Sequence, residues 1–466
     1  GLYEVALDEL SKISVNGKEI RPKIIASTAT VKRANNQIKA LFNRRVVDIF
    51  PPPCPNRRDS FFAITKRPNE TNARLYMGVP AMGRGTKATQ LRIYLVLLAS
   101  AQYFFDLPEN LSQENNPADP YMTMLGYFNS LRELGGTRRL MEDQVWNNLT
   151  AYGRRLRVGE TASMFGTREV AYEPVELTSR ISTAKVSEYK RQLSLAFPNP
   201  KRDANGRIIK GGPKGPDKPV DMAIATNMIS VGLDITRLGL MVVCGQPKTS
   251  AEYIQATSRV GRDDKRPGLV VTILNLKKPR DRSHYEQFAP YHESFYRSVE
   301  ATSVTPFSPR ALDRGLAAVL VAMIRQGNQR MTAAARASEI LKQRPNLDWV
   351  VHVLADRALE CCGLNEAEAR KQVSERVKAR AMDLMDIWYK HAAKLAEKGT
   401  VLQYQTEDSG QMLKRLLYEF LHPDLKEFAN NSPEMKFRAN RSMRDVEPSV
   451  NLFVQRISGR TVEEDE

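Results

Sequence analysis

The stretch DMAIATNMISVGLDITRLGLMVVCG, residues 221–245, decides the fold class of this 466-residue chain. It contains two apolar runs, at 221–226 and 238–245, each long enough for one buried strand and short for a helix. Similar runs lie at residues 74–80, 122–128 and 268–276, with helix-like segments between them. Buried strands that alternate with helices predict an α/β fold, in which a mostly parallel sheet is covered by helices on both faces.

The turn after the first of these strands has side chains that suit a nucleotide. Thr226 ends the apolar run with a hydroxyl, and Gly232 and Asp234 close the excursion that follows. A hydroxyl and backbone N–H groups at a strand end can bind a phosphate, and an acid eight residues further on can bind a ribose hydroxyl. The same residues also fit a plain structural turn, so both interpretations stay open here.

The segment QATSRVGR, residues 255–262, follows the second strand and has the pattern of a helix start. Arg259 and Arg262 are three positions apart, which predicts that they share one helix face. A guanidinium keeps its charge and matches a phosphate through two parallel hydrogen bonds. Gly261 permits close approach, and Gln255 can hold a water or a phosphate oxygen. The pattern predicts arginine fingers, with a solvated helix face as the alternative.

The charge balance points to a polyanionic partner. The formal net charge is +17 and the pI is near 9.6. Solubility alone could account for this charge, but nucleic acid is the better explanation. We find no apolar run of 18 or more residues, so we expect no transmembrane helix and no membrane partner. Four cysteines without a C-x-x-C pair argue against a disulfide framework and a metal site, and favour a cytoplasmic protein.

Proline, glycine and apolar patterning divide the chain into regions. We expect a strand–helix unit at 1–50, a linker at 51–58, an α/β domain at 59–300 with a basic loop at 197–219, and a helical region with an acidic tail at 301–466. In the first region, Ile24–Ala26 is predicted as a short buried strand. That unit has little sequence before it to build a sheet, so we expect it to be the end of a longer domain.

Four segments, in this order, resemble motifs of the superfamily 2 helicases. IASTAT (25–30) resembles motif III, YFNSLREL (127–134) lies where motif IV belongs, ATNMISVGLDI (225–235) resembles motif V, and YIQATSRVGR (253–262) resembles motif VI. Two positions depart from the usual pattern: Asn227 stands where many relatives have Asp, and Ser258 where motif VI usually has a glycine. Both changes are small and polar. The resemblance implies RecA-like domains, of which 1–50 is the trailing end of the first and 59–300 is the second.

The resemblance also implies roles for individual residues. Gln255, Arg259 and Arg262 correspond to the catalytic, nucleotide-facing residues of motif VI, and Gly232 and Asp234 to positions near the nucleotide. Thr28, Ala29 and Thr30 correspond to motif III, which couples the nucleotide state to strand binding. The candidates for nucleic-acid contact are Asn129, Ser130, Arg132, Thr178, Arg180 and Thr226. For most of these the alternative is a helix cap or a surface salt bridge.

Two parts that an ATP-driven motor needs are absent from this sequence. It has no P-loop of the form G-x-x-x-x-G-K-[ST], and GRGTKAT (83–89) imitates one only superficially. Asp8 and Glu9 could be mistaken for an acidic Mg²⁺ box, but they fit better on the solvated face of a helix. We therefore expect ATP and Mg²⁺ to bind mainly to an N-terminal helicase lobe absent from this chain. The chain alone is expected to be inactive.

Three further stretches resemble the large helicase subunit of the DISARM phage-defence system. They are VELTSRISTAKVSEYKRQL (175–193), RSHYEQFAPYHESFYRSVEATSVTPFSPRALDRGL (282–316) and RANRSMRDVEPSVNL (438–452). This resemblance implies an ATP-dependent DNA helicase or translocase in antiviral defence, paired with a subunit that carries a DUF1998 domain. The alternatives are a catalytically inactive nucleic-acid-binding or scaffold lobe, and a DNA-repair or RNA helicase of the same superfamily.

Overall fold

The computed structural model divides the chain into two compact units. Unit 1 consists of Gly1–Ala26, Arg33–Asp48 and Thr302–Glu466, and unit 2 consists of Ser27–Lys32 and Ile49–Ala301. Within them the structure describes residues 1–28, 30–52, 54–56, 59–67, 70–156, 158–178, 181, 183–199, 217–226, 234–263, 265–300, 304–405, 413–420 and 422–440. Residues 1–26 and 33–48 therefore group with the helical region. Whether residues 1–50 also belong to a first RecA-like domain stays a prediction.

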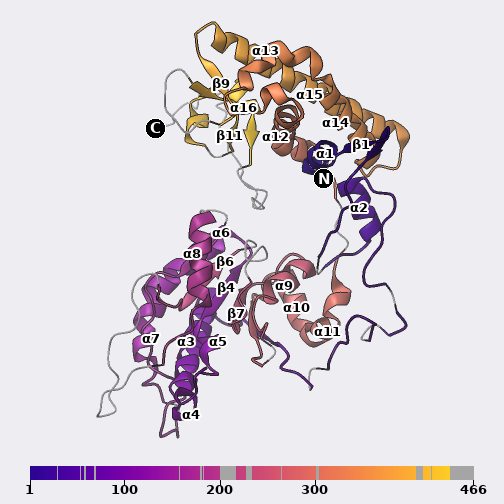
Figure 1. Cartoon of the computed structure of the whole chain (residues 1–466). Helices are drawn as coiled ribbons and strands as arrows, with labels where there is room; N and C mark the ends of the chain where they lie inside the picture. The colour runs from indigo at the N-terminus through magenta and orange to yellow at the C-terminus, as the bar shows by residue number, and fades with distance from the viewer. Residues whose placement is uncertain are drawn as a thin grey trace, which may run out of the picture. The chain divides into compact units, whose positions relative to one another are not determined.

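Unit 2 is built on a six-stranded sheet in which every neighbouring pair of strands is parallel (Figure 1). The strands, in spatial order, are β3 (Leu75–Pro80), β8 (Leu269–Leu274), β7 (Leu240–Cys244), β4 (Met124–Phe128), β6 (Met222–Ala225) and β5 (Val175–Leu177). All residues of β4 and β6 are buried, as their apolar sequences require. The predicted parallel α/β sheet is confirmed.

Helices cover both faces of this sheet, because successive side chains of a strand point to opposite sides. Leu125 and Tyr127 of β4 pack in one hydrophobic core, and Met124 and Phe128 pack in the other. The first core is closed by α8 (Thr183–Ser194) and α9 (Ser250–Thr257). The second core is closed by α3 (Thr86–Phe105), α6 (Leu131–Leu140) and α7 (Trp146–Tyr152). The remaining helices of unit 2 are α4 (Pro108–Leu111), α5 (Asp119–Met122), α10 (Pro279–Glu286) and α11 (Phe288–Glu293).

Unit 1 is mainly helical, as predicted for the C-terminal region. Its largest helices are α12 (Pro309–Gly327), α14 (Asp348–Cys361) and α15 (Ala367–Ala396), and α1 (Leu2–Leu10) packs against α12 in the same core. Trp388 is fully buried there, and its indole N–H donates to the carbonyl of Ala337 at 3.0 Å. The shorter elements are α2 (Ala34–Phe42), α13 (Ile340–Gln343), α16 (Pro433–Lys436), β1 (Ile13–Val15), β2 (Lys18–Ile20), β9 (Val401–Gln403), β10 (Leu413–Arg415), β11 (Tyr418–Glu419) and β12 (Arg438–Ala439).

Two expectations for the first fifty residues are wrong. Ile24–Ala26 forms no strand, and Ile25 is 89% exposed, because no strand of the described chain pairs with this segment. Asp8 lies on a helix as expected, but its side chain is buried rather than solvated. Asp8 follows Val5 by three residues, so both lie on the face of α1 that packs into the core.

Candidate nucleotide and nucleic-acid site

The nucleic-acid candidates that the structure describes lie at one edge of the sheet. The strands are parallel, so their carboxyl ends meet at the same edge, here called the carboxyl edge. Thr178 follows β5, Thr226 follows β6, and Asn129 and Ser130 follow β4. Ala225 is in register with Tyr127 on one side and with Leu177 on the other, so the residues that follow these three are neighbours across the sheet.

Asn129 ties the ends of β4 and β7 together. Its Nδ2 donates to the carbonyls of Cys244 at 3.2 Å and Gly245 at 3.1 Å. Gly245 has a φ of +79°, and a Cβ there would lie 3.4 Å from Asn129 Nδ2. The Oδ1 of Asn129 is buried and has no partner within the described residues. Asn129 therefore holds the backbone of this edge and also presents an unsatisfied acceptor there.

The other candidates at the carboxyl edge have more ordinary surroundings. Ser130 is the N-cap of α6, where its Oγ accepts from the N–H of Glu133 at 3.3 Å, so the helix-cap alternative is realised. Arg132 is exposed in the first turn of α6. Thr178 and Thr226 are buried, and Thr178 Oγ1 donates to Glu176 Oε1 at 2.6 Å. Arg180, Gly232 and Ala29 lie outside the described residues.

The segment QATSRVGR is the end of a helix, which corrects its interpretation as a helix start. Helix α9 begins at Ser250, after the N-cap Thr249, and ends at Thr257. Arg259 and Arg262 therefore follow the helix and do not share one of its faces. A helix C-terminus is electrostatically favourable for cations, which gives a physical reason for arginines at this position.

The turn that carries the two arginines lies at the opposite, amino-terminal edge of the sheet. The N–H of Gly261 donates to the carbonyl of Leu238 at 2.8 Å, two residues before β7 begins. Gly261 has a φ of +63°, and a Cβ on it would lie 2.5 Å from the Cα of Gly268, so only glycine fits. The backbone that lies close to Gly261 is that of Gly268, the residue before β8.

Arg262 and Asp234 form an ion pair between Nη1 and Oδ1. The Nε of Arg262 also donates to the carbonyl of Ser258 at 3.0 Å, so the guanidinium is oriented from two sides. The side chain of Asp234 is 70% exposed, and that of Arg262 is 27% exposed. Partial burial, followed by the charge of Arg262, lowers the pKa of Arg259, while Asp234 opposes this change. Asp234 therefore pairs directly with Arg262 and acts on Arg259 only through its charge.

Gln255 reaches the predicted motif III segment. Its Nε2 donates to the Oγ1 of Thr30 at 3.0 Å, a contact between residues that are 225 positions apart in the chain. The N–H of Thr30 in turn donates to the Oγ1 of Thr28 at 3.3 Å. Both partners belong to unit 2, because Ser27–Lys32 groups with the sheet. Side-chain contacts therefore link three sequence motifs: Gln255 contacts Thr30, and Arg262 contacts Asp234.

Two acids that support these loops, the buried Asp281 and the exposed Glu300, were missed from the sequence. Asp281 of α10 is 3% exposed, and its carboxylate accepts from the N–H groups of Gln246 at 3.1 Å and Asn275 at 2.9 Å. Glu300 accepts from the N–H of Ser250 through both oxygens, at 2.8 and 2.9 Å, at the start of α9. Both acids lie in charged, polar sequence, which gives no signal that distinguishes them from solvated residues.

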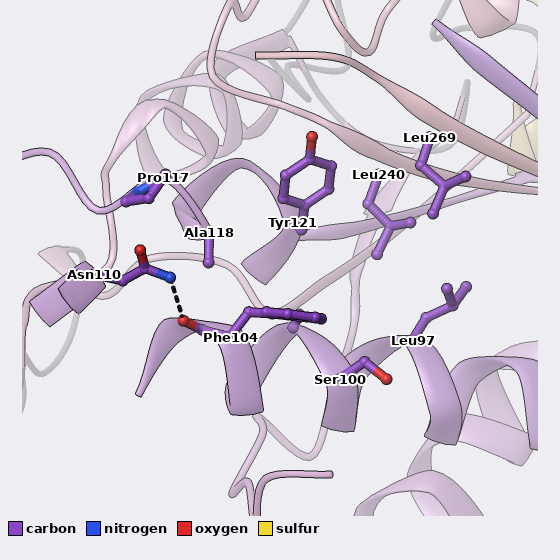
Figure 2. Close-up of a pocket in the computed structure, with 10 residues that line it drawn as sticks. Leu97, Ser100, Phe104, Asn110, Pro117, Ala118, Tyr121, Leu240 and Leu269 are labelled. Atoms are coloured by element: carbon purple, nitrogen blue, oxygen red, sulfur yellow. Dashed lines mark hydrogen bonds between the residues drawn. The ribbon is translucent and has the colours of Figure 1, made fainter. Parts of the chain in front are cut away.

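Unit 2 also contains an apolar pocket (Figure 2). It has a volume of about 360 Å³ and is lined by Leu97 and Phe104 of α3, Tyr121 of α5, Leu240 and Leu269, among others. The Tyr121 hydroxyl donates to the carbonyl of Pro267 at 2.5 Å. None of the described residues that line this pocket is charged, so it does not suit a phosphate.

Within the described residues, no helix is long and apolar enough to cross a membrane. In the same part of the chain, no group of three or more His, Cys, Asp or Glu side chains is placed to hold a metal ion.

Comparison with known proteins shows which proteins the chain resembles. Residues 202–264 match the helicase conserved C-terminal domain. Over 325 residues the chain is 41% identical to the DISARM protein DrmA of Bacillus paralicheniformis, an alignment that covers 70% of this chain and 26% of DrmA. The chain is therefore helicase-like and related to DrmA. It spans about a quarter of the length of the curated relative that it matches.

Solved structures of helicases are also similar to this chain. One is the DUF1998 helicase MrfA bound to DNA and AMPPNP, with 14% identity, a TM-score of 0.35, and coverage of 68% of this chain and 34% of MrfA. Another is the helicase Lhr of Mycobacterium smegmatis bound to single-stranded DNA and AMP-PNP, with 14% identity, a TM-score of 0.34, and coverage of 67% and 33%.

Proposed function

We propose that this chain is the C-terminal part of an ATP-dependent DNA helicase or translocase of superfamily 2 that acts in antiviral defence. ATP and Mg²⁺ would be held mainly by an N-terminal helicase lobe, which is absent from this chain. The observation that carries the proposal is the pair of contacts Thr30–Gln255 and Asp234–Arg262. They join residues from three sequence motifs whose family roles all concern the nucleotide.

In this proposal Arg259 and Arg262 stabilise the negative charge that develops on the transferring phosphoryl group. Arg262 is already charged and oriented, and its present partner Asp234 is a solvent-exposed carboxylate. A triphosphate carries more negative charge than one carboxylate, so it can take over Arg262 when it is brought against this turn. Asp234 is then released to accept a hydrogen bond from the ribose, and Gln255 links the nucleotide to Thr30.

The nucleic-acid strand is assigned to the carboxyl edge of the sheet. There Asn129, Ser130, Thr178 and Thr226 follow adjacent strands, and Arg132 supplies an exposed positive charge. Arg180 follows Thr178 in sequence and is assigned to the same contact. Hydroxyl, amide and guanidinium groups of this kind bind phosphate oxygens without reading the bases. The net charge of +17 supports a polyanionic partner for the whole chain.

The antiviral role and the partner subunit rest on sequence similarity. The relative that is 41% identical is named a DISARM protein, which supports a role in the same type of defence system. The resemblance noted from the sequence further suggests a partner subunit with a DUF1998 domain.

The test of the proposal is an ATPase assay on two proteins. The 466-residue chain alone should show no DNA-stimulated turnover, whereas a protein that also contains the first lobe should hydrolyse ATP. Turnover by the chain alone would contradict the split site. If the longer protein binds DNA but never hydrolyses ATP, the chain is instead an inactive nucleic-acid-binding lobe. DNA affinity should fall steeply with salt, and RNA of the same sequence serves as the competing substrate.

A further inference from the structure

Unit 1 contains a polar pocket that is lined mainly by cationic and amide side chains. It has a volume of about 410 Å³ and is formed by α2, the segment after it, the end of α14 and the first turn of α15. Four cationic side chains line it, Lys39, Arg44, Arg45 and Arg370, together with asparagine amides and one carboxylate, Glu360. We call this the cationic pocket. Its volume is that of a typical small-ligand site.

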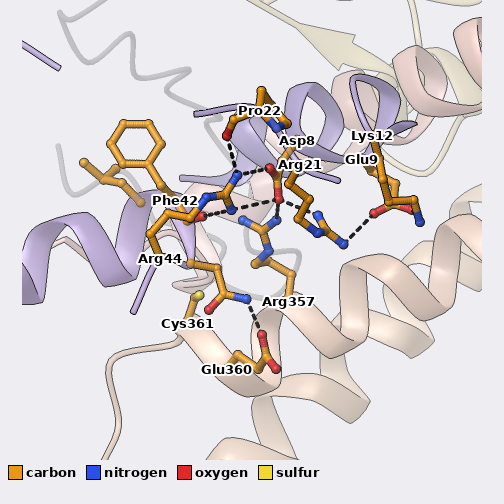
Figure 3. Close-up of polar contacts among 12 residues, drawn as sticks. Asp8, Glu9, Lys12, Arg21, Pro22, Phe42, Arg44, Arg357, Glu360 and Cys361 are labelled. Atoms are coloured by element: carbon orange, nitrogen blue, oxygen red, sulfur yellow. Dashed lines mark hydrogen bonds and ion pairs between the residues drawn. The ribbon is translucent and has the colours of Figure 1, made fainter. Parts of the chain in front are cut away.

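Two of the charged groups in the cationic pocket already have partners inside the protein (Figure 3). Arg44 donates to Asp8 Oδ1 at 2.6 Å and to the carbonyls of Phe42 at 3.0 Å and Pro22 at 3.1 Å. Glu360 accepts a hydrogen bond from the Nδ2 of Asn43. Arg44 is therefore held by Asp8, and one oxygen of Glu360 is occupied.

The other three cationic side chains of the pocket, Lys39, Arg45 and Arg370, have no such carboxylate partner among the described residues. Within the described residues, the side chains of Lys39 and Arg45 have no ion-pair partner, and both residues are exposed. The Nε of Arg370 is buried and has no hydrogen-bond partner. Arg370 is therefore not held by a carboxylate of the described residues as Arg44 is by Asp8. Arg370 also lies in the first turn of the 30-residue helix α15, where the helix dipole favours an anion.

We propose that the cationic pocket binds a backbone phosphate of a nucleic-acid strand through Lys39, Arg45 and Arg370. This contact adds to the carboxyl edge of the sheet, and it rests on the proposed function only in taking nucleic acid as the partner. Guanidinium groups bind phosphate oxygens in pairs, and a lysine adds a point charge. None of the described residues that line the pocket is aromatic, so it has no platform on which to stack a base. The contact is therefore independent of sequence.

The experiment measures the affinity of the full 466-residue chain for end-labelled single-stranded DNA, duplex DNA and RNA by fluorescence anisotropy. The double variant Arg45→Ala/Arg370→Ala should bind about tenfold more weakly at low salt. The slope of log affinity against log salt should fall by about 0.7 for single strands and about 0.9 for duplex, as expected for the loss of one phosphate contact. The matched control Lys371→Ala/Lys398→Ala removes the same charge from exposed positions of unit 1 outside the pocket. It should keep the affinity of the parent chain.

Further outcomes separate the possible ligands and the possible failures. Arg45→Glu alone changes an exposed residue and should weaken binding even if loss of Arg370 disturbs folding. Tripolyphosphate is the free-phosphate probe: if the pocket variants lose tripolyphosphate binding but keep DNA affinity, the nucleic-acid assignment is overturned. Equal effects of the pocket and control variants overturn it too, as does a parent chain that binds no nucleic acid. The ATPase assay of the longer protein does not depend on these results, so failure of the proposed function is detected separately.

Discussion

Each unit of this chain contains a cluster in which a carboxylate pairs with arginine, and the two clusters differ in burial. In unit 1, Asp8 pairs with Arg21, Arg44 and Arg357, and its side chain is only 3% exposed (Figure 3). In unit 2, Asp234 pairs with Arg262, and its side chain is 70% exposed. The aspartate–arginine pair is therefore buried in unit 1, whereas in unit 2 its carboxylate is exposed to solvent.

This difference decides what each cluster can do. The guanidinium groups around Asp8 join α1, the segment after α2 and α14, so they hold parts of unit 1 that are far apart in sequence. A buried charge that loses its partner is strongly destabilising. Exposed ion pairs contribute little to stability, so Arg262 can exchange Asp234 for another anion at small cost. Burial therefore assigns Asp8 to folding, whereas exposure of the Asp234 carboxylate allows Arg262 to change partners.

The largest effect is expected for Arg262→Ala in a protein that includes the first lobe. If Arg262 acts as an arginine finger, ATP turnover should fall about 10³-fold, while the melting temperature stays close to that of the parent. Lys265→Ala is the matched control, because it removes an exposed positive charge three residues further along. Near-normal hydrolysis by the Arg262→Ala protein would make Arg262 a structural residue and would remove the contrast with the Asp8 cluster.

The next effect is expected for Asp8→Asn, measured as the free energy of unfolding of the chain. The substitution keeps the shape of the side chain but leaves the buried Arg357 without its countercharge, which should cost about 3 kcal/mol. Chemical denaturation with tryptophan fluorescence as the signal would measure this, since Trp388 lies in the core of unit 1. A loss below about 0.5 kcal/mol would mean that water solvates the cluster.

The same cluster gives a pH dependence with a definite sign. Burial raises the pKa of Asp8, but the hydrogen bond from Arg44 and the charges of Arg357 and Arg21 outweigh it, and the pKa is lowered from 3.8. The stabilisation is therefore fully present above pH 3.8 and is lost as the pH falls further. In Asp8→Asn this acid-dependent part of the stability should be missing, which gives a second measurement of the same interaction.

The sequence predicted the elements that follow from apolar patterning, and it failed where long-range contacts decide. The buried runs that end at Phe128, Ala225 and Cys244 are strands because apolar residues of that length must pair within a sheet. Ile24–Ala26 has the same local composition, but no described strand lies beside it, and it stays irregular. A strand depends on its neighbours, and one segment does not contain that information.

For the candidate site, residue types were easier to predict than their surroundings. Arg259 and Arg262 could be selected because their chemistry suits a phosphate, and Asp234 because a carboxylate can bind a ribose hydroxyl, but the position of the two arginines past the C-terminus of α9 was missed. The contact between Gln255 and Thr30 spans 225 positions, and no local pattern encodes it. Asp8 looked solvated because an acid on a helix usually is. Its three arginines come from segments that only the folded structure brings together.

The smallest effect is expected for Asp234→Asn, and it provides the sharpest test of the comparison. The chemical change is the same as in Asp8→Asn, but the carboxylate is mostly in water, so the free energy of unfolding should change by less than about 0.5 kcal/mol. Asp217→Asn is the control, because Asp217 pairs with Arg191 in another exposed ion pair of unit 2. A loss of about 3 kcal/mol in Asp234→Asn alone would show that Arg262 depends on Asp234 for its structure. An arginine with that role could not be released to a phosphate, and the assignment of Arg262 to the nucleotide would fail.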